Sequence, residues 1–185
     1  MKRAVSFTSM AAAVLLAFAM PLYAVKTVDM PKNFGSDEWV AGHWQEAVGY
    51  LKYMVKDDVR KQMLNLPDVD RMTAWESVWK AKDPSGGSLA DQREAQFFER
   101  IRYANENFGT ILQPGWLTQM GETWIRLGKP DWREHYTMRG PGRNVEVWNY
   151  MNPRDLYLVF LDRSGLGDWE LLNYSSMIDE VYLYN

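Results

Sequence analysis

The stretch SLADQREAQFFERIRYANENFG, residues 88–109, separates two parts of the chain with different sequence patterns. Ser88 and Asp91 resemble a capping box at its start, and Gly109 suits the position after the last helical residue. The sequence therefore predicts a helix of about 20 residues here, the longest in the chain. Its apolar residues recur at helical spacing: Leu89, Phe97, Phe98, Ile101, Ala104 and Phe108.

The part of the chain before this stretch carries further helical patterns. Between residues 36 and 55, apolar residues recur at intervals of three and four and predict an amphipathic helix. The same stripe resumes over 59–66, and Pro67 closes it. Another helix is predicted over 68–81, with Asp68 as its N-terminal cap.

After Gly109 the helical period gives way to short alternating or apolar runs, which predict strands. Val145, Val147 and Asn149 share one face of such a run, and Gly140–Gly142 marks a turn. Helices followed by strands predict an α+β fold, with N-terminal helices packed on a small, mainly antiparallel β-sheet. The predicted strands cover residues 123–127, 135–138, 145–150, 156–161 and 168–172.

The composition narrows the class of protein. The chain has 185 residues, a net charge of −3, 46% hydrophobic residues and 24% charged residues, which are values typical of a globular domain. The chain lacks the excess of basic residues that is typical of a nucleic-acid-binding protein, so nucleic acid is not an expected partner. Because cysteine is absent, the chain has no disulfide, thiol nucleophile, cysteine-bound zinc or lipoprotein anchor.

Residues 1–24 have the pattern of a secretory signal peptide. Lys2 and Arg3 precede an apolar run, Pro21 ends that run, and Ala24 offers a small residue before the cleavage point. The alternative is an uncleaved anchor, but the run is shorter than the ~20 residues that a membrane span needs. The pattern therefore predicts export and cleavage.

Cleavage after Ala24 would leave the protein in the periplasm or outside the cell, without a stable membrane span. Ala17–Ala19 offers a second cleavage site. Residues 25–36 mix Pro, Gly, Lys and Asp without periodicity, so we expect a linker or an arm there. Residues 37–185 are then expected to form a single domain.

Several segments resemble one known family. The chain contains GWLTQ at residues 115–119 and IRLGKPD at 125–131, preceded by WKAKDP at 79–84 and RYANENF at 102–108, and followed by EVWNY at 146–150 and VFLDR at 159–163. In order and spacing these segments resemble the GWxTD domain, over roughly residues 50–172. That family occurs in exported bacterial proteins and has no established biochemical activity. The resemblance implies a non-catalytic binding or structural module of the cell envelope, with an envelope protein or a polysaccharide as its partner.

The chain departs from the family pattern at four positions. Gln119 stands where the family name has Asp, and Met120 stands where a basic residue usually follows. Lys129 replaces the first proline of the turn, and Lys82 replaces the Arg of an Arg-Asp-Pro motif. The first two changes remove a charge pair, so any mechanism that depends on the loop carboxylate is not expected here.

The loop Gly115–Thr118, called the GW loop below, is expected to contact the long helix. Arg102 and Asn105 are three residues apart and therefore share a helix face at the border of its apolar stripe. We predict that this pair organises the loop, with Asn105 bonding to loop backbone groups and Arg102 to loop carbonyls or to Asp83. Trp116 is expected to fill the gap between helix and sheet, and Thr118 to cap the turn into the next strand.

Acidic residues leave a second functional class open. Asp83, Glu122 and Asp131 flank the GW loop in sequence, and a glycoside hydrolase uses two carboxylates. The alternative function is thus an envelope carbohydrate-active enzyme or another hydrolase. Asp83 and Asp131, each beside a proline, are also explained as turn residues, and no catalytic residue is assigned.

The remaining chemistry-bearing residues give a weaker signal. His43 and Glu46 alone make a poor metal site, so no metal and no cofactor are predicted. Trp79 and Phe108 lie on helical apolar stripes and are expected in the core. Other tryptophans are less clearly internal and are candidates for contact with sugar or protein: Trp39, Trp132 and Trp169.

Overall fold

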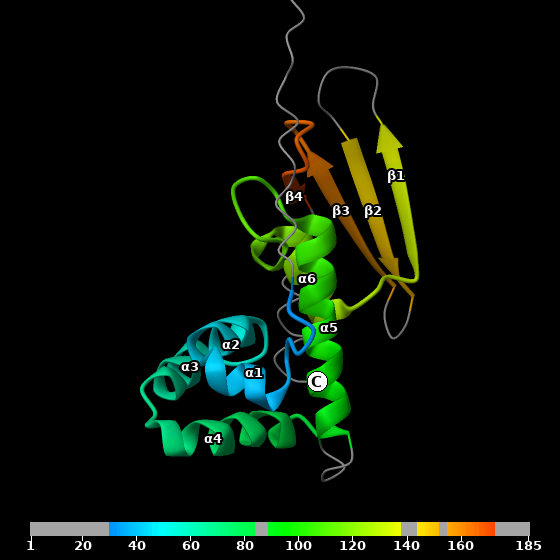
Figure 1. Ribbon diagram of the computed structural model, residues 1–185. Coiled ribbons are helices and arrows are strands. Elements are labelled where there is room, and N and C mark those ends of the chain that lie inside the picture. The colour runs from blue at the N-terminus through cyan, green and yellow to red at the C-terminus, as the bar shows by residue number, and fades with distance from the viewer. Residues whose placement is uncertain (1–29, 84–88, 138–143, 152–154, 173–185) are drawn as a thin grey trace, which may run out of the picture.

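The computed structural model describes residues 30–83, 89–137, 144–151 and 155–172. The signal peptide predicted over 1–24, the Ser88 cap and the Gly140–Gly142 turn lie outside these described residues. The described chain has the predicted α+β fold (Figure 1). Its helical elements are α1 (Asp37–Gly42), α2 (Trp44–Tyr50), η1 (Leu51–Tyr53), α3 (Asp57–Leu64), α4 (Asp68–Ala81), α5 (Ala90–Phe108), η2 (Gly115–Leu117) and α6 (Gln119–Leu127).

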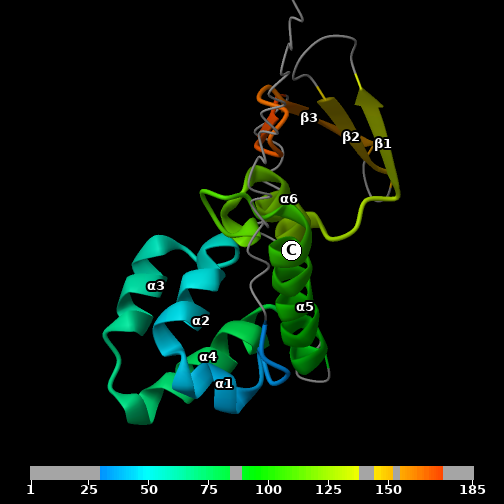
Figure 2. The same ribbon diagram turned by 45° about the horizontal axis from the view of Figure 1, so that its top comes forward.

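The strands form one antiparallel sheet in the order β1-β2-β3-β4, so each strand pairs with the next in sequence. Helix α5 links the helices that precede it to the sheet that follows it. One end of α5 lies beside α1 and α4, and the other end lies beside α6 near the sheet (Figures 1 and 2). The predicted antiparallel sheet is therefore confirmed. Its strands are β1 (Trp132–Thr137), β2 (Asn144–Tyr150), β3 (Leu156–Asp162) and β4 (Trp169–Leu171).

The predicted first helix is broken into α1 and α2. His43 has the non-helical dihedrals φ −124° and ψ 38°, and its ring stacks on Trp39 at 4.7 Å between ring centres. The Nδ1 atom of His43 also lies 3.0 Å from the carbonyl oxygen of Trp39. The change of direction lets both Trp39 and Trp44 enter the core, where they are 3% and 4% exposed.

Helix α4 has the predicted bounds, but its N-terminal cap differs from the prediction. Pro67 occupies the cap position with an extended backbone, and Asp68 is the first helical residue. The carboxylate of Asp68 pairs with Arg71 at 2.6 Å instead of capping the helix. A proline before the first helical turn fits because its missing N–H is not needed there.

The strand predicted over 123–127 is wrong, because these residues belong to helix α6. Thr118 caps the helix, since its Oγ1 accepts a hydrogen bond from the N–H of Gly121 at 3.0 Å. Gly128, with φ +78°, ends it. Alternation over five residues cannot distinguish the repeat of a strand from that of a helix, whereas the Thr118 cap and the terminal Gly128 indicate a helix.

The core is rich in aromatic rings and includes the described end of the expected arm. Phe34, from the segment 25–36, is 7% exposed and meets the Phe98 ring edge-on at 5.1 Å. Trp79 and Phe108 are 1% and 7% exposed, which confirms that both are core residues. Residues 30–36 therefore pack on the domain.

The two faces of the sheet differ in burial. The inner face, toward α5 and α6, carries Trp148 and Phe160, which are fully buried, and Trp148 contacts the Phe108 ring at 5.5 Å. The face that bears Val145 and Val147 is the outer one, and both side chains are only half-buried there. The described helices lie on the inner side in Figure 1.

Candidate functional site

The GW loop lies so close to α5 that its glycine has no room for a side chain. A Cβ atom at Gly115 would lie 1.8 Å from the carbonyl oxygen of Ala104, which is a fixed backbone atom of α5. A Cβ at Gly121 would similarly lie 1.8 Å from the carbonyl oxygen of Gly115. Gly115 therefore lets the loop pack backbone to backbone on α5, and Gly121 lets the first turn of α6 pack on the loop.

Asn105 makes the contact with the loop that the sequence predicts. The Asn105 side chain is buried, and its Oδ1 accepts a hydrogen bond from the N–H of Trp116 at 3.0 Å. Thr118 closes the loop from the other side, because its hydroxyl donates to the carbonyl oxygen of Gly115 at 2.8 Å. The loop backbone is thus satisfied by buried polar side chains, as buried polar groups require.

Trp116 packs on the helical part of the molecule, so its predicted place between helix and sheet is wrong. Its ring meets Tyr50 edge-on at 4.8 Å and Tyr53 at 6.3 Å. The Tyr53 hydroxyl donates to the carbonyl oxygen of Trp116 at 2.6 Å. Burial, reinforced by the charge of Glu122, holds the pKa of Tyr53 above its usual range, so the hydroxyl stays a donor at neutral pH.

The predicted contact of Arg102 with the loop is wrong. Its guanidinium lies 5.8 Å from the centre of the Phe34 ring, and within the described chain it makes no hydrogen bond to Gly115–Thr118. Arg102 and Asn105 are three residues apart on α5, which leaves their side chains about 60° apart around the helix, so they point to neighbouring surfaces. Asn105 faces the loop, whereas Arg102 faces the segment before α1.

Gln119, which replaces the family aspartate, connects α6 to the sheet. Its Oε1 accepts a hydrogen bond from the backbone N–H of Leu171 in β4 at 2.5 Å. The glutamine side chain is one methylene longer than aspartate and reaches this strand from the first residue of α6. The departure from the family pattern therefore has a structural role in this chain.

The three acids of the hydrolase hypothesis are each used locally. Asp83 is buried, and its Oδ2 accepts from the N–H of Leu89 at 3.2 Å, just before α5. Glu122 pairs with Arg126 at 2.9 Å. Asp131 is exposed and accepts from the N–H of Met151 at 2.7 Å. Each carboxylate thus fixes a different turn or helix, and the three share no bond partner among these contacts.

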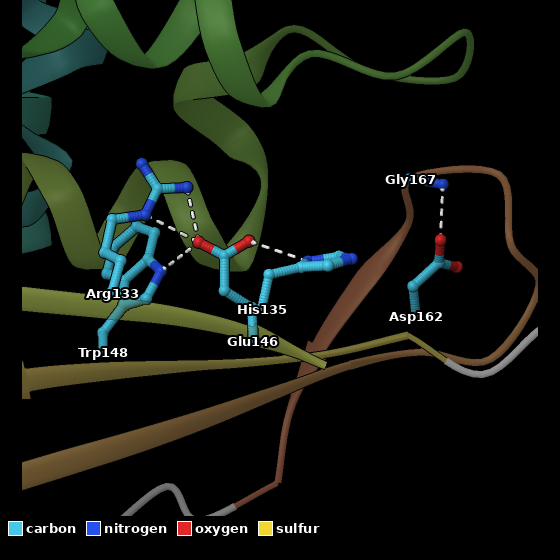
Figure 3. Close-up of polar contacts among 6 residues, drawn as sticks. All are labelled: Arg133, His135, Glu146, Trp148, Asp162 and Gly167. Atoms are coloured by element: carbon cyan, nitrogen blue, oxygen red, sulfur yellow. Dashed lines mark hydrogen bonds and ion pairs between the residues drawn. The ribbon is translucent and has the colours of Figure 1, made fainter. Parts of the chain in front are cut away.

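The inner face of the sheet holds a charged cluster that sequence reasoning missed (Figure 3). Glu146 is 8% exposed, and its Oε1 accepts from the Nε of Arg133 at 2.6 Å and from the indole N–H of Trp148 at 2.7 Å. Nδ1 of His135 lies 3.9 Å from the other carboxylate oxygen. Arg133 and His135 pair across the strands with Trp148 and Glu146, so only the strand register brings the cluster together.

Asp162 stands apart from this cluster and organises the turn after β3 (Figure 3). Its carboxylate accepts from the backbone N–H groups of Ser164, Gly165 and Gly167 at 3.2, 2.8 and 2.9 Å. Burial opposes ionisation, but these hydrogen bonds outweigh it and hold the pKa of Asp162 below its usual range. Asp162 is therefore ionised at neutral pH and is unsuited to act as a general acid.

Histidines and acids do not assemble into a metal-binding group among the described residues. His43 stacks on Trp39, and His135 lies beside Glu146 and meets the Trp169 ring at 5.9 Å. Of the tryptophans proposed for external contact, Trp39 is buried, Trp169 is half-buried and Trp132 is 60% exposed. No helix in the described ranges combines the length and apolarity that crossing a bilayer requires.

The fold and the loop define an α+β domain in which a Gly-Trp turn joins a long helix to the helices before it and to the sheet after it. The sequence profile of the GWxTD domain matches residues 33–176, so the chain belongs to the GWxTD domain family. This match extends the region of resemblance to the segment before α1. No curated protein and no solved structure matches the chain.

Proposed function

We propose that this chain is an exported, non-catalytic binding module of the bacterial cell envelope. It acts in the periplasm or outside the cell after residues 1–24 are removed. Its partner is an envelope protein that docks on the outer face of the sheet. The proposal rests on the leader pattern, on family membership and on the exposed aromatic side chains of that face.

The outer sheet face, defined here by Trp132, Tyr136, Val145, Val147 and Tyr157, is the observation that carries the proposal. Strand register places these side chains on one side of β1, β2 and β3. The three aromatic side chains are 60%, 49% and 53% exposed, in the order given. Exposed rings on a rigid sheet offer a large contact area with few rotamers to order, which is typical of protein interfaces.

A protein fits this face better than a polysaccharide does. A sugar that stacks on an aromatic ring needs hydrogen-bonding side chains beside that ring for its hydroxyl groups, because unpaired polar groups are costly to desolvate. The centre of the face carries Val145 and Val147, which offer no such groups. Of the polar side chains that β1 and β2 add to this face, Glu134 already accepts a hydrogen bond from the Tyr136 hydroxyl, and the Oδ1 atom of Asn149 is buried. Branched aliphatic residues between aromatic ones favour an apolar protein surface instead.

Hydrolysis has weaker support. A general acid near neutral pH needs a raised pKa, whereas hydrogen bonds lower that of Asp162. Glu94 has a raised pKa of about 7, but its Oε1 already accepts a hydrogen bond from the Trp75 indole N–H. Glu146 is held by Arg133 and Trp148, so its Oε1 is already engaged. Asp83, Glu122 and Asp131 each stabilise a local structure.

Affinity capture from the native envelope tests the proposal. The wild-type chain and a Trp132→Ser/Tyr136→Ser variant are immobilised, and the proteins that each retains are identified by mass spectrometry. Val69→Ser/Leu112→Ser is the matched control, because these two side chains are 84% and 83% exposed elsewhere on the surface. We expect the wild type and the control to retain the same protein and the sheet variant to lose it. Equal capture by all three, or retention of polysaccharide alone, would contradict the proposal.

Export has a test of its own. Intact-mass measurement of the protein extracted from the native envelope is expected to give a chain that begins at Val25. The reason is the short apolar run followed by Pro21 and Ala24. A chain that keeps Met1 and sediments with membranes would overturn this part of the proposal.

A further inference from the structure

A cavity of about 340 Å³ lies between η1, the end of α4, α5 and α6, away from the outer sheet face. Four basic side chains line it: Lys82, Arg93, Arg100 and Arg126. Arg93 and Arg100 are seven residues apart on α5 and therefore share a helix face. The chain as a whole carries a net charge of −3, so this basic cavity is a local concentration of positive charge.

Two of the four guanidinium and ammonium groups are held in place by the protein. Arg100 donates to the carbonyl oxygens of Ile125 and Arg126 at 3.1 and 3.4 Å. Arg126 pairs with Glu122 at 2.9 Å, and its guanidinium lies 5.4 Å from the centre of the Tyr53 ring. These contacts orient both side chains at low entropic cost for a ligand.

Lys82 and Arg93 complete the wall without such a partner. Both are half-buried, and neither has a carboxylate within ion-pair distance among the described residues. Like charges that line one cavity repel each other, and partial burial strengthens that repulsion. An anion in the cavity would relieve it, because its oxygens would pair with ammonium and guanidinium donors.

The cavity also has an apolar side. Phe97 and Ile125 line it and are 4% and 3% exposed, and the Tyr53 ring lines it as well. A ligand that filled the space would place an apolar group against these rings and its charge against the arginines. Cavities of about 300–1,000 Å³ with few convergent polar groups are typical small-molecule sites, and this one falls at the small end of that range.

We propose that the basic cavity binds a small organic anion, a carboxylate or a phosphate attached to an aromatic or aliphatic group. Lys82 and Arg93 supply the charge that is not otherwise paired, and Arg100 and Arg126 supply oriented donors. The arginine fork matches both anionic groups in geometry. This site is independent of the outer sheet face, so the two proposals fail or stand separately.

Titration calorimetry of the purified full chain tests the site, with benzoate and phenyl phosphate as anionic probes and benzyl alcohol as the neutral probe. We expect one-to-one binding of at least one anion, weakened by added salt, and no binding of benzyl alcohol. Tighter binding of phenyl phosphate assigns the site to phosphates, and tighter binding of benzoate assigns it to carboxylates. Failure of both anions to bind at concentrations above about 1 mM, where a site this charged should be filled, would overturn the proposal.

Matched variants separate the cavity from general surface charge. Lys82→Gln/Arg93→Gln is expected to weaken anion binding about tenfold or more, because two charge-assisted hydrogen bonds are lost. Lys61→Gln/Lys80→Gln removes the same charge from exposed positions and is expected to bind as the wild type does. Arg93→Lys keeps the charge and should retain most of the affinity. Equal loss in both double variants, at unchanged unfolding midpoints, would contradict a built site.

Discussion

The GW loop and the outer sheet face use similar residue types in opposite ways. Around the loop, Asn105, Thr118 and Trp116 are buried or half-buried and bond to the protein itself. On the outer sheet face, Trp132 and Tyr136 are half-exposed or more. The sequence motif that marks the family therefore builds the junction between helices and sheet, whereas the surface proposed to bind a partner lies outside that motif.

This difference separates two kinds of substitution. A change at the junction should alter the free energy of unfolding, because backbone approach and buried hydrogen bonds are lost there. A change on the outer sheet face should leave stability almost unaltered and should act on partner binding.

Gly115→Ala is expected to destabilise the fold by more than about 3 kcal/mol or to prevent folding. The added Cβ would lie 1.8 Å from the carbonyl oxygen of Ala104, and a helix backbone cannot move aside cheaply. Urea unfolding followed by tryptophan fluorescence measures the effect. Gly49→Ala is the control, because a Cβ there meets nothing within 4 Å, and it should stabilise by about 0.5–1 kcal/mol. Similar midpoints for the two variants would contradict the packing described here.

Asn105→Ala is expected to cost about 1–3 kcal/mol, since it leaves the partly buried N–H of Trp116 without its acceptor. The matched control is Asn107→Ala, on the same helix, where the exposed side chain donates only to the carbonyl oxygen of Tyr103. Its expected cost is below about 0.5 kcal/mol, as for most surface substitutions. Urea unfolding measures the free energy of unfolding of both variants. An Asn105→Ala variant as stable as Asn107→Ala would contradict the role assigned to Asn105.

Glu94→Gln is expected to change how stability depends on pH. Burial, with smaller contributions from Asp37, Asp91 and Glu76, raises the pKa of Glu94 to about 7, although the Trp75 indole N–H bonds to it at 2.6 Å. Because the pKa of Glu94 is higher in the folded than in the unfolded chain, Glu94 favours the folded state most below about pH 4.5. Its contribution to the free energy of unfolding then declines as the pH rises toward 7.

The variant keeps the acceptor for Trp75 but has no charge to bury. At pH 7 to 8 it should therefore be more stable than the wild type by about 1 kcal/mol, a value reduced for the partial exposure of the site. The difference should shrink as the pH falls to 4.5. Unfolding midpoints in urea at several pH values measure it, and a difference that does not vary with pH would contradict a raised pKa.

The sequence predicted those parts of this architecture that depend on long or complete local patterns. The bounds of α4, the strands β2 and β3, and the contact of Asn105 with the loop all follow from periodicity and helix-face geometry. Helix α6 is not predicted, because alternation over five residues fits a strand as well as a helix. The break at His43 was missed because the apolar stripe continues through it.

Other features depend on relationships that a single sequence does not contain. The pair of Arg133 with Glu146 requires the register between β1 and β2. The basic cavity gathers Lys82 and Arg126 from helices that are more than 40 residues apart along the chain. Neither local propensity nor charge pattern reports such proximity, so these sites became visible only in the folded structure.

The proposed function requires that the family motif maintains the fold while the outer sheet face binds the partner. The most direct measurement is capture of the same envelope protein by Asn105→Ala and by Trp132→Ser/Tyr136→Ser, each compared with the wild type at a temperature where all three are folded. We expect Asn105→Ala to retain the partner despite its lower free energy of unfolding. We expect the sheet variant to lose the partner while its free energy of unfolding stays within about 0.5 kcal/mol of the wild type. Loss of the partner by Asn105→Ala together with its retention by the sheet variant would contradict binding at the outer sheet face.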